Sequence, residues 1–210
     1  MRAVRILTRR SASFVLCVAA VVALSGVAAA DVSPINPNNR PTALVGAVNG
    51  VVPKSRLVNV AANCVAAREA GPSLARIFAM AREINDALGA DQCYRPLSDE
   101  VKFANQANQP GNNPACVATV GTSPTGAPVG HSYHGWGKAV DLTDAGRSLT
   151  FASPGYAFMK RFAGALGWNH PAFAEPGGST CPEPWHWEWV GDGGTMHGYG
   201  VRVDLMTWAR

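Results

Sequence analysis

The chain has 210 residues, with 18 basic and 14 acidic side chains and a formal net charge of +4. Four of the basic residues are arginines within residues 1–30, which contain no acidic residue, so 14 of each sign remain. This balance gives no electrostatic reason to expect nucleic-acid binding. The roughly 180 residues that follow fit one domain with a single core, and no repeat divides them.

Residues 1–30 have the three parts of a secretory signal peptide. Its parts are a positive start (Arg2, Arg5, Arg9 and Arg10), an apolar run (Phe14–Ala30) and a cleavage site of small residues (Ala28–Ala30). An uncleaved membrane anchor is the alternative, but the run is short for a span and finishes in small residues. We therefore expect a secreted protein of the cell envelope, outside the cytoplasm, monomeric and without stable membrane insertion once the signal is removed.

Four cysteines remain once Cys17 leaves with the signal: Cys64, Cys93, Cys116 and Cys181. An even number of cysteines in an exported chain indicates two disulfides, for which three pairings are possible. No two of them have C-x-x-C spacing, so a cysteine-rich zinc site is not expected.

Two segments are rich in Pro, Asn and Gly and lack sustained periodicity. Residues 31–60 are expected to form an extended N-terminal arm or linker. Asn105–Gly130 is a long polar segment around a small apolar patch, and loops of this length in compact domains are usually functional or disordered. Its position directly before His131 suggests that it forms a wall of the site.

Three helices and a strand are predicted from the remaining pattern. Apolar residues recur at helical spacing over Ser73–Leu88, with Gly89 after the last. A short strand is expected at Asp91–Arg95 and a second, short helix at Ser98–Gln106. A third helix is predicted over Pro154–Leu166, which has an apolar stripe. The fold class that we expect is α+β, a single domain with a small, mainly antiparallel sheet flanked by these helices.

The stretch His131–Leu142 brings together two imidazoles, two glycines and a carboxylate. His134 and Asp141 are candidate zinc ligands, but seven residues apart they would face opposite sides of a regular strand. A tight turn through the two glycines, leading into a strand over Lys138–Leu142, would let both side chains reach one ion. The alternative is a glycine turn with an incidental histidine, in which the aspartate caps a turn.

The segment Glu183–Val190 alternates three tryptophans with His186 and Glu188. A period of two predicts a strand with the indoles on one face and His186 and Glu188 on the other. Pro184 breaks the strand at its start, and a bend there would bring Glu183 alongside His186. The alternative is a tryptophan-rich core strand whose histidine is simply hydrogen-bonded.

Together these segments resemble the zinc D-alanyl-D-alanine carboxypeptidases of the VanY and VanX type, in the LAS group of peptidoglycan metallopeptidases. The resemblance covers about residues 73–190. The matching residues are Ser132, His134, Gly137, Ala139, Asp141, Leu142, Glu183, Trp185 and His186, with Tyr94-Arg95 before them. It implies that residues 61–210 form a zinc peptidase domain of the hedgehog/D-Ala-D-Ala peptidase fold, with a peptidoglycan stem peptide as its substrate.

The resemblance also implies a role for each matched residue. His134, Asp141 and His186 would bind Zn2+, and Glu183 would be the general base and acid. Arg95 would stabilise the oxyanion, and Ser132 would contact the terminal carboxylate of the substrate. Glu188 lies on the His186 face and is expected to orient that imidazole.

One position departs from the family and three alternatives stay open. Glu100 stands where family members often have Gln, which puts the helper role of that position in doubt. The leading function is removal of the terminal D-Ala from a stem peptide. The alternatives are an endopeptidase with the same zinc chemistry, a non-catalytic zinc or wall-binding module like the hedgehog domains, and a cysteine peptidase that uses Cys181.

Overall fold

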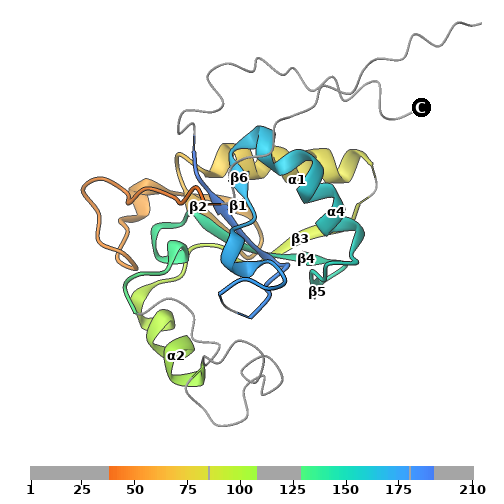
Figure 1. Cartoon of the computed structure of the whole chain (residues 1–210). Coiled ribbons are helices and arrows are strands. Elements are labelled where there is room, and N and C mark those ends of the chain that lie inside the picture. The colour runs from red at the N-terminus through yellow and green to blue at the C-terminus, as the bar shows by residue number, and fades with distance from the viewer. Residues whose placement is uncertain (1–37, 85, 108–128, 180, 192–210) are drawn as a thin grey trace, which may run out of the picture. The chain divides into compact units, whose positions relative to one another are not determined.

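The structure is a computed structural model that describes residues 38–84, 86–107, 129–179 and 181–191 (Figure 1). The expected signal peptide and most of the Asn105–Gly130 segment lie outside these ranges. Among the helices that the structure describes, none is both long and apolar enough to cross a bilayer.

The main sheet has five strands, all paired antiparallel. Its strand order is β3 (Leu88–Gln92), β4 (Ala139–Asp144), β7 (His186–Trp189) and β6 (Trp168–Asn169), and β5 (Arg147–Ser148) also pairs with β4. A separate antiparallel pair is formed by β1 (Leu57–Ala61) and β2 (Cys64–Ala67). The helices are α1 (Gly71–Glu83), α2 (Leu97–Ala107) and α4 (Pro154–Phe162). The 3-10 turns are η1 (Lys54–Arg56), η2 (Tyr133–Trp136), η3 (Ala163–Leu166) and η4 (Ala172–Ala174). These elements confirm the predicted α+β class.

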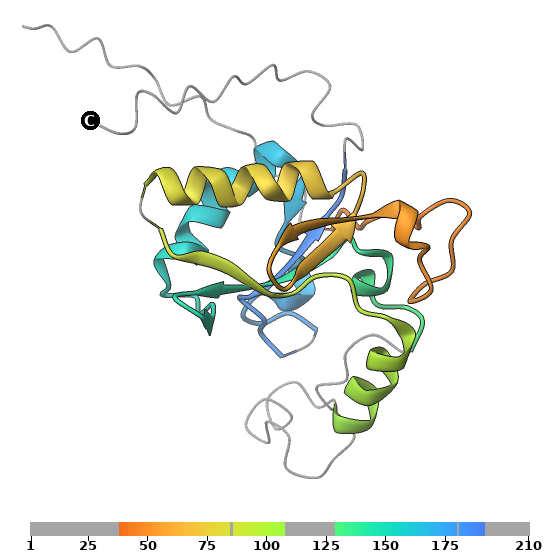
Figure 2. The ribbon, with the colours of Figure 1, turned by 180° about the vertical axis from the view of Figure 1, so that it is seen from behind.

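The core lies between the main sheet and two of the helices. Figures 1 and 2 show α1 and α4 side by side along the sheet, with α2 apart from both. Val140 and Trp187 are cross-strand partners whose side chains are buried in this core. Because side chains alternate along a strand, their neighbours Asp141 and His186 point to the opposite face of the sheet.

The helix predicted over Ser73–Leu88 is shorter than expected. Its apolar stripe is buried as predicted, but α1 runs from Gly71 to Glu83. Leu88 keeps the helical spacing in the sequence, yet it begins β3 and pairs with Asp144. The strand expected at residues 91–95 therefore lies three residues earlier in the chain. Cross-strand pairing, which is not visible in a local pattern, decides this boundary.

The segment expected to be an extended arm packs against the domain. Leu44 and Val52 are buried in the core, and β1 pairs with β2. The hydroxyl of Tyr94 donates to the carbonyl of Gly50 over 2.8 Å, which ties this segment to the end of β3. The Pro, Asn and Gly residues among its apolar residues indicate a loop, so the sequence pattern alone does not reveal this packing.

Cys64 on β2 and Cys93 at the end of β3 form a disulfide. It joins the small strand pair to the main sheet across 29 residues. Cys181 is also disulfide-bonded, which removes the free thiol that a cysteine peptidase would need. Cys116 lies outside the described residues.

Candidate metal centre

A short 3-10 turn places His134. The hydroxyl oxygen of Ser132 accepts a hydrogen bond from the backbone N–H of His134 over 3.2 Å and caps η2. Gly137 ends the turn with a φ of 68°, and a Cβ there would lie 2.6 Å from the backbone nitrogen of Ala67. Only glycine fits so close a backbone in this conformation. The structure thus contains the predicted glycine turn, and β4 begins two residues later.

Strand pairing brings Asp141 and His186 together. The two residues are direct partners in the β4–β7 ladder, so their side chains stand side by side on one face. Asp141 Oδ1 lies 3.1 Å from His186 Nδ1 and 3.2 Å from His134 Nε2, and these two nitrogens are 3.2 Å apart. Two nitrogens and one oxygen therefore converge on one point, which suits a tetrahedral Zn2+ with an open fourth position.

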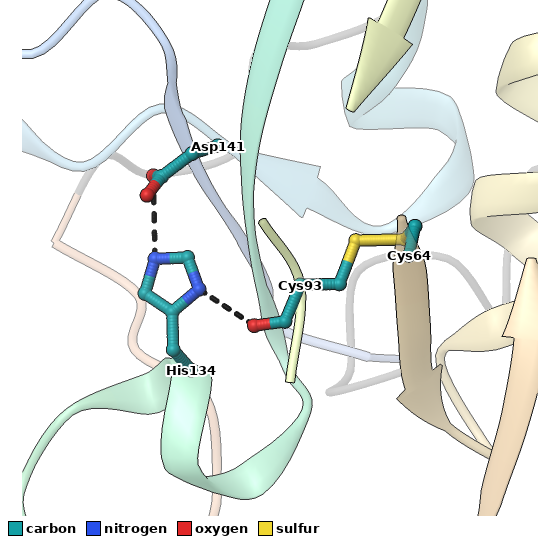
Figure 3. The surroundings of a disulfide bond; sticks show 4 residues. All are labelled: Cys64, Cys93, His134 and Asp141. Carbon is teal, nitrogen blue, oxygen red and sulfur yellow. Dashed lines mark hydrogen bonds and ion pairs between the residues drawn. A yellow bond between two sulfur atoms is a disulfide. The ribbon is translucent and has the colours of Figure 1, made fainter. Parts of the chain in front are cut away.

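The second nitrogen of each imidazole has an acceptor of its own. His134 Nδ1 lies 2.7 Å from the carbonyl oxygen of Cys93 (Figure 3), and His186 Nε2 lies 3.1 Å from Glu188 Oε1. Both acceptors favour a proton on these outer nitrogens, which leaves the inner nitrogens of His134 and His186 as donors to a metal. The donor set and its hydrogen bonds therefore fit a bound zinc ion.

The charges of the cluster are strongly coupled. Burial would raise the pKa of Asp141, but the neighbouring His134 and His186 hold it well below its usual range. Burial lowers the pKa of His134. Burial would also lower the pKa of His186, but hydrogen bonds to Asp141 and Glu188 outweigh this effect and raise it to about 10. The site thus holds an ionised carboxylate, the form that binds a metal.

Arg95 is aimed at the cluster from the end of β3. Its Nε donates to Gln92 Oε1 over 2.6 Å, and its Nη2 lies 3.5 Å from Asp141 Oδ2. The guanidinium also stacks on the ring of Phe103 on α2, 4.3 Å from the ring centroid. Three contacts therefore fix a cation beside the candidate ligands.

Glu183 precedes β7 on a turn. The backbone N–H of His186 donates to the carbonyl of Glu183 over 3.0 Å, which is the bend expected at Pro184. Burial raises the pKa of the Glu183 carboxyl, and the positive charges of His186 and Arg95 oppose this rise. Its carboxyl group therefore lies within the electrostatic field of the cluster.

The model of the VanY D-alanyl-D-alanine carboxypeptidase family matches residues 65–192. The chain belongs to this family. The family match covers all the residues that converge on the candidate metal position and confirms the resemblance seen in the sequence. No curated protein matches the chain.

Several solved structures share the fold. One is VanYB in complex with D-alanine-D-alanine, with a TM-score of 0.51, 21% identity, and coverage of 66% of this chain and 79% of that one. A mutant of the D,D-pentapeptidase VanY in complex with Zn(II) gives a TM-score of 0.53 at 18% identity, covering 76% and 92%. The LD-carboxypeptidase LdcB gives 0.52 at 21% identity, covering 76% and 87%. At these identities the likeness concerns the fold.

Two further positions of this VanY-family chain have clear structural contacts. Ser132 is buried and caps η2, so its capping role is visible and a substrate contact remains a prediction. Glu100 on α2 is buried, and its Oε2 accepts a hydrogen bond from the backbone N–H of Gly130 over 2.6 Å. The carboxylate that replaces the usual Gln thus holds the residue that precedes the His131–Leu142 stretch.

The structure adds Arg40, which the sequence analysis did not single out. Its Nη2 donates to Glu188 Oε1 over 3.0 Å, although the two residues are 148 positions apart. A cavity of about 380 Å³ beside it is lined by Asn38, Arg40, Ala172, Phe173, Gly178 and Ser179. No local signal could reveal this contact, because Arg40 lies in a Pro- and Asn-rich stretch without periodicity.

Proposed function

We propose that this chain is a secreted zinc carboxypeptidase that removes the terminal D-Ala of peptidoglycan stem peptides outside the cytoplasm. One observation carries the proposal: His134, Asp141 and His186 converge within a VanY-family domain, with Glu183 and Arg95 beside them. A solved structure with the same fold is a complex of VanYB with D-alanine-D-alanine, which supports a substrate of this class.

The metal would be held by Nε2 of His134, a carboxylate oxygen of Asp141 and Nδ1 of His186. When bound, zinc would supply Lewis-acid chemistry: it would polarise a carbonyl group and lower the pKa of water toward neutrality. Cys93 and Glu188 would keep the two imidazoles in the required tautomers, through the hydrogen bonds of 2.7 Å and 3.1 Å.

Glu183 is proposed to move the protons. Its carboxylate would accept a proton from the attacking water and then donate it to the nitrogen of the leaving D-Ala. A carboxyl group whose pKa is raised by burial is suited to both steps, because it holds the proton more readily than a solvated glutamate.

Arg95 and Ser132 are proposed to bind the substrate. Arg95 would donate hydrogen bonds to the oxygen of the scissile carbonyl, where negative charge develops in the transition state. Its contacts with Gln92, Asp141 and Phe103 orient it in advance, so little reorganisation is needed. Ser132 would hydrogen-bond the terminal carboxylate of the peptide.

The products of digestion test this function. The full chain, loaded with zinc, is incubated with purified muropeptides that end in D-Ala-D-Ala, and the products are weighed by mass spectrometry. We expect the loss of one alanine from each pentapeptide stem. A stem that is cut internally would instead identify the endopeptidase, which shares the zinc chemistry but needs a cleft open at both ends.

A non-catalytic zinc or wall-binding module is the second alternative. Such a protein would bind zinc and leave every muropeptide intact. Glu183→Gln is the matched control, because it removes the proposed base and keeps the three metal ligands. Intact muropeptides with both the zinc-loaded parent and Glu183→Gln would support the non-catalytic module.

A further inference from the structure

Arg40 reaches the metal centre from a segment that precedes the family domain, whose matched residues begin at 65. Its Nη2 lies 3.0 Å from Glu188 Oε1, and the same oxygen lies 3.1 Å from His186 Nε2. On the other side of the imidazole, Nδ1 of His186 lies 3.1 Å from Asp141. A continuous row of contacts thus runs from the Arg40 guanidinium through Glu188 to a candidate metal ligand.

The carboxylate of Glu188 needs a cation at this place. Its side chain is only 1% exposed, and its Oε2 is buried without a hydrogen-bond partner among the described residues. An ionised carboxylate is costly to bury unless a charge or several donors compensate it. Arg40 places a full positive charge against the same oxygen that contacts His186, so it compensates the burial of Glu188 and fixes the oxygen that orients the imidazole.

Arg40 itself is held in a fixed position. Its guanidinium lies between two aromatic rings, 4.8 Å from the ring centroid of Tyr133 and 4.6 Å from that of Phe173. Tyr133 immediately precedes the ligand His134, and the ring of Phe173 lies 5.8 Å from that of His186. The two rings that clamp Arg40 therefore belong to the surroundings of two different candidate ligands.

The backbone on both sides of Arg40 is anchored to the main sheet. Asn169 on β6 donates its side-chain N–H to the carbonyl of Asn39 over 3.1 Å. The buried ammonium of Lys138, directly before β4, donates to the carbonyl of Thr42 over 2.8 Å. Because Asn39 and Thr42 are tied down on either side of it, Arg40 approaches Glu188 from an anchored segment.

We propose that Arg40 is a positioning residue of the metal centre, which fixes Glu188 and through it the imidazole of His186. The inference rests on the proposed function, because it concerns the same metal. Arg40 acts on a hydrogen-bond partner of a ligand, and the loss of such outer contacts typically weakens metal binding by about 10- to 100-fold. We expect Arg40→Ala to lie near the lower end, on the order of 10-fold.

The test is a double-mutant cycle on zinc affinity, measured with the full chain by competition against a chelator of known affinity. Arg40→Ala should weaken zinc binding in the parent and have little further effect in a Glu188→Gln background, since the contact is already altered there. Arg40→Lys keeps a cation beside Glu188 and should recover part of the loss. Arg56→Ala is the matched control, because the guanidinium of this half-buried arginine of the same region donates to the carbonyl of Val45 and contacts no candidate ligand among the described residues.

A second readout separates positioning from a general loss of stability. Cobalt(II) replaces zinc, and its visible spectrum reports the arrangement of the ligands. We expect Arg40→Ala to change this spectrum in folded protein and Arg56→Ala to leave it unchanged. Unchanged zinc affinity in Arg40→Ala, no recovery in Arg40→Lys, or an equal loss in the Glu188→Gln background would overturn the inference. A parent chain that binds no zinc would instead overturn the proposed function itself.

Discussion

The carbonyl oxygen of Cys93 accepts a hydrogen bond from Nδ1 of His134 over 2.7 Å, so a disulfide-bonded residue orients a candidate metal ligand (Figure 3). The disulfide fixes the end of β3 against β2, and the carbonyl that it holds in place selects the tautomer of the imidazole. The covalent framework and the proposed chemistry therefore meet at one residue.

Removal of this disulfide should weaken both stability and metal binding. For a bridge across 29 residues, we expect Cys64→Ser/Cys93→Ser to lower the free energy of unfolding by about 3–4 kcal/mol. Zinc affinity should also fall, because the Cys93 carbonyl is less well held. Urea unfolding and chelator competition measure the two effects. A double variant that is less stable but binds zinc as tightly as the parent would show that the carbonyl is held without the bridge.

Asp141→Ala should abolish stoichiometric zinc binding. The substitution removes one of three donor atoms and also the acceptor that lies 3.2 Å and 3.1 Å from the two imidazoles. Metal content of the purified protein, measured by mass spectrometry of the elements, gives the result directly. Asp91→Ala is the control, since Asp91 is an exposed carboxylate on β3. One zinc per chain in Asp141→Ala would exclude the proposed ligand set.

Glu183→Gln should keep zinc and lose turnover. The amide cannot take a proton from water, and general acid–base catalysis usually contributes about 10²- to 10⁴-fold to the rate. We expect a fall in kcat of that size with the metal content unchanged. Steady-state kinetics on a D-Ala-D-Ala peptide, with metal analysis of the same sample, separates the two properties. A variant that retains full kcat would assign the base to another residue.

Arg95→Lys should lower kcat although it keeps the positive charge. Lysine cannot contact Gln92, Asp141 and Phe103 at once, so the donor for the oxyanion would lose its orientation. Loss of one such donor typically costs about 10²- to 10³-fold in kcat. Arg76→Lys, at an exposed position on α1, should leave kinetics unchanged. Equal kcat for Arg95→Lys and the parent would contradict the oxyanion role.

The metal-free protein should lose stability as the pH rises above neutrality. Burial lowers the pKa of His186, but Asp141 and Glu188 outweigh burial and raise it from 6.5 to about 10. Because the folded state binds this proton more tightly, its stabilising effect is complete below pH 6.5 and is lost as the pH approaches about 10. Urea unfolding between these pH values, with a chelator present, measures how the free energy of unfolding changes with pH. His186→Gln should make this free energy less dependent on pH. An unchanged pH dependence in that variant would assign the effect to other titrating groups.

Local sequence chemistry predicts part of the site. The seven-residue spacing of His134 and Asp141 is incompatible with a regular strand, and the glycines between them indicate the turn that the structure contains. The alternation around His186 likewise predicts which side chains share a face with Glu188. Both inferences depend only on the period of a strand and on the conformations open to glycine.

The remaining features depend on contacts between distant parts of the chain. Nothing near Asp141 in the sequence encodes its pairing with His186, which requires the register of two strands. The end of α1 is ambiguous because Leu88 satisfies both the helical spacing and a strand position. Arg40 meets Glu188 across 148 positions, and an isolated arginine in an aperiodic segment carries no mark of its partner.

The packing of the first described residues changes where the working unit begins. The family match starts at residue 65, yet Leu44 and Val52 fill the core, and β1 lies before that point. A fragment cut at the family boundary would expose the partners of these residues and leave Glu188 without its cation. Expression of the folded domain should therefore begin before Asn38. Residues 38–61 are part of this domain, so we expect substitutions there to affect its stability as core substitutions do, and not as substitutions in a linker would.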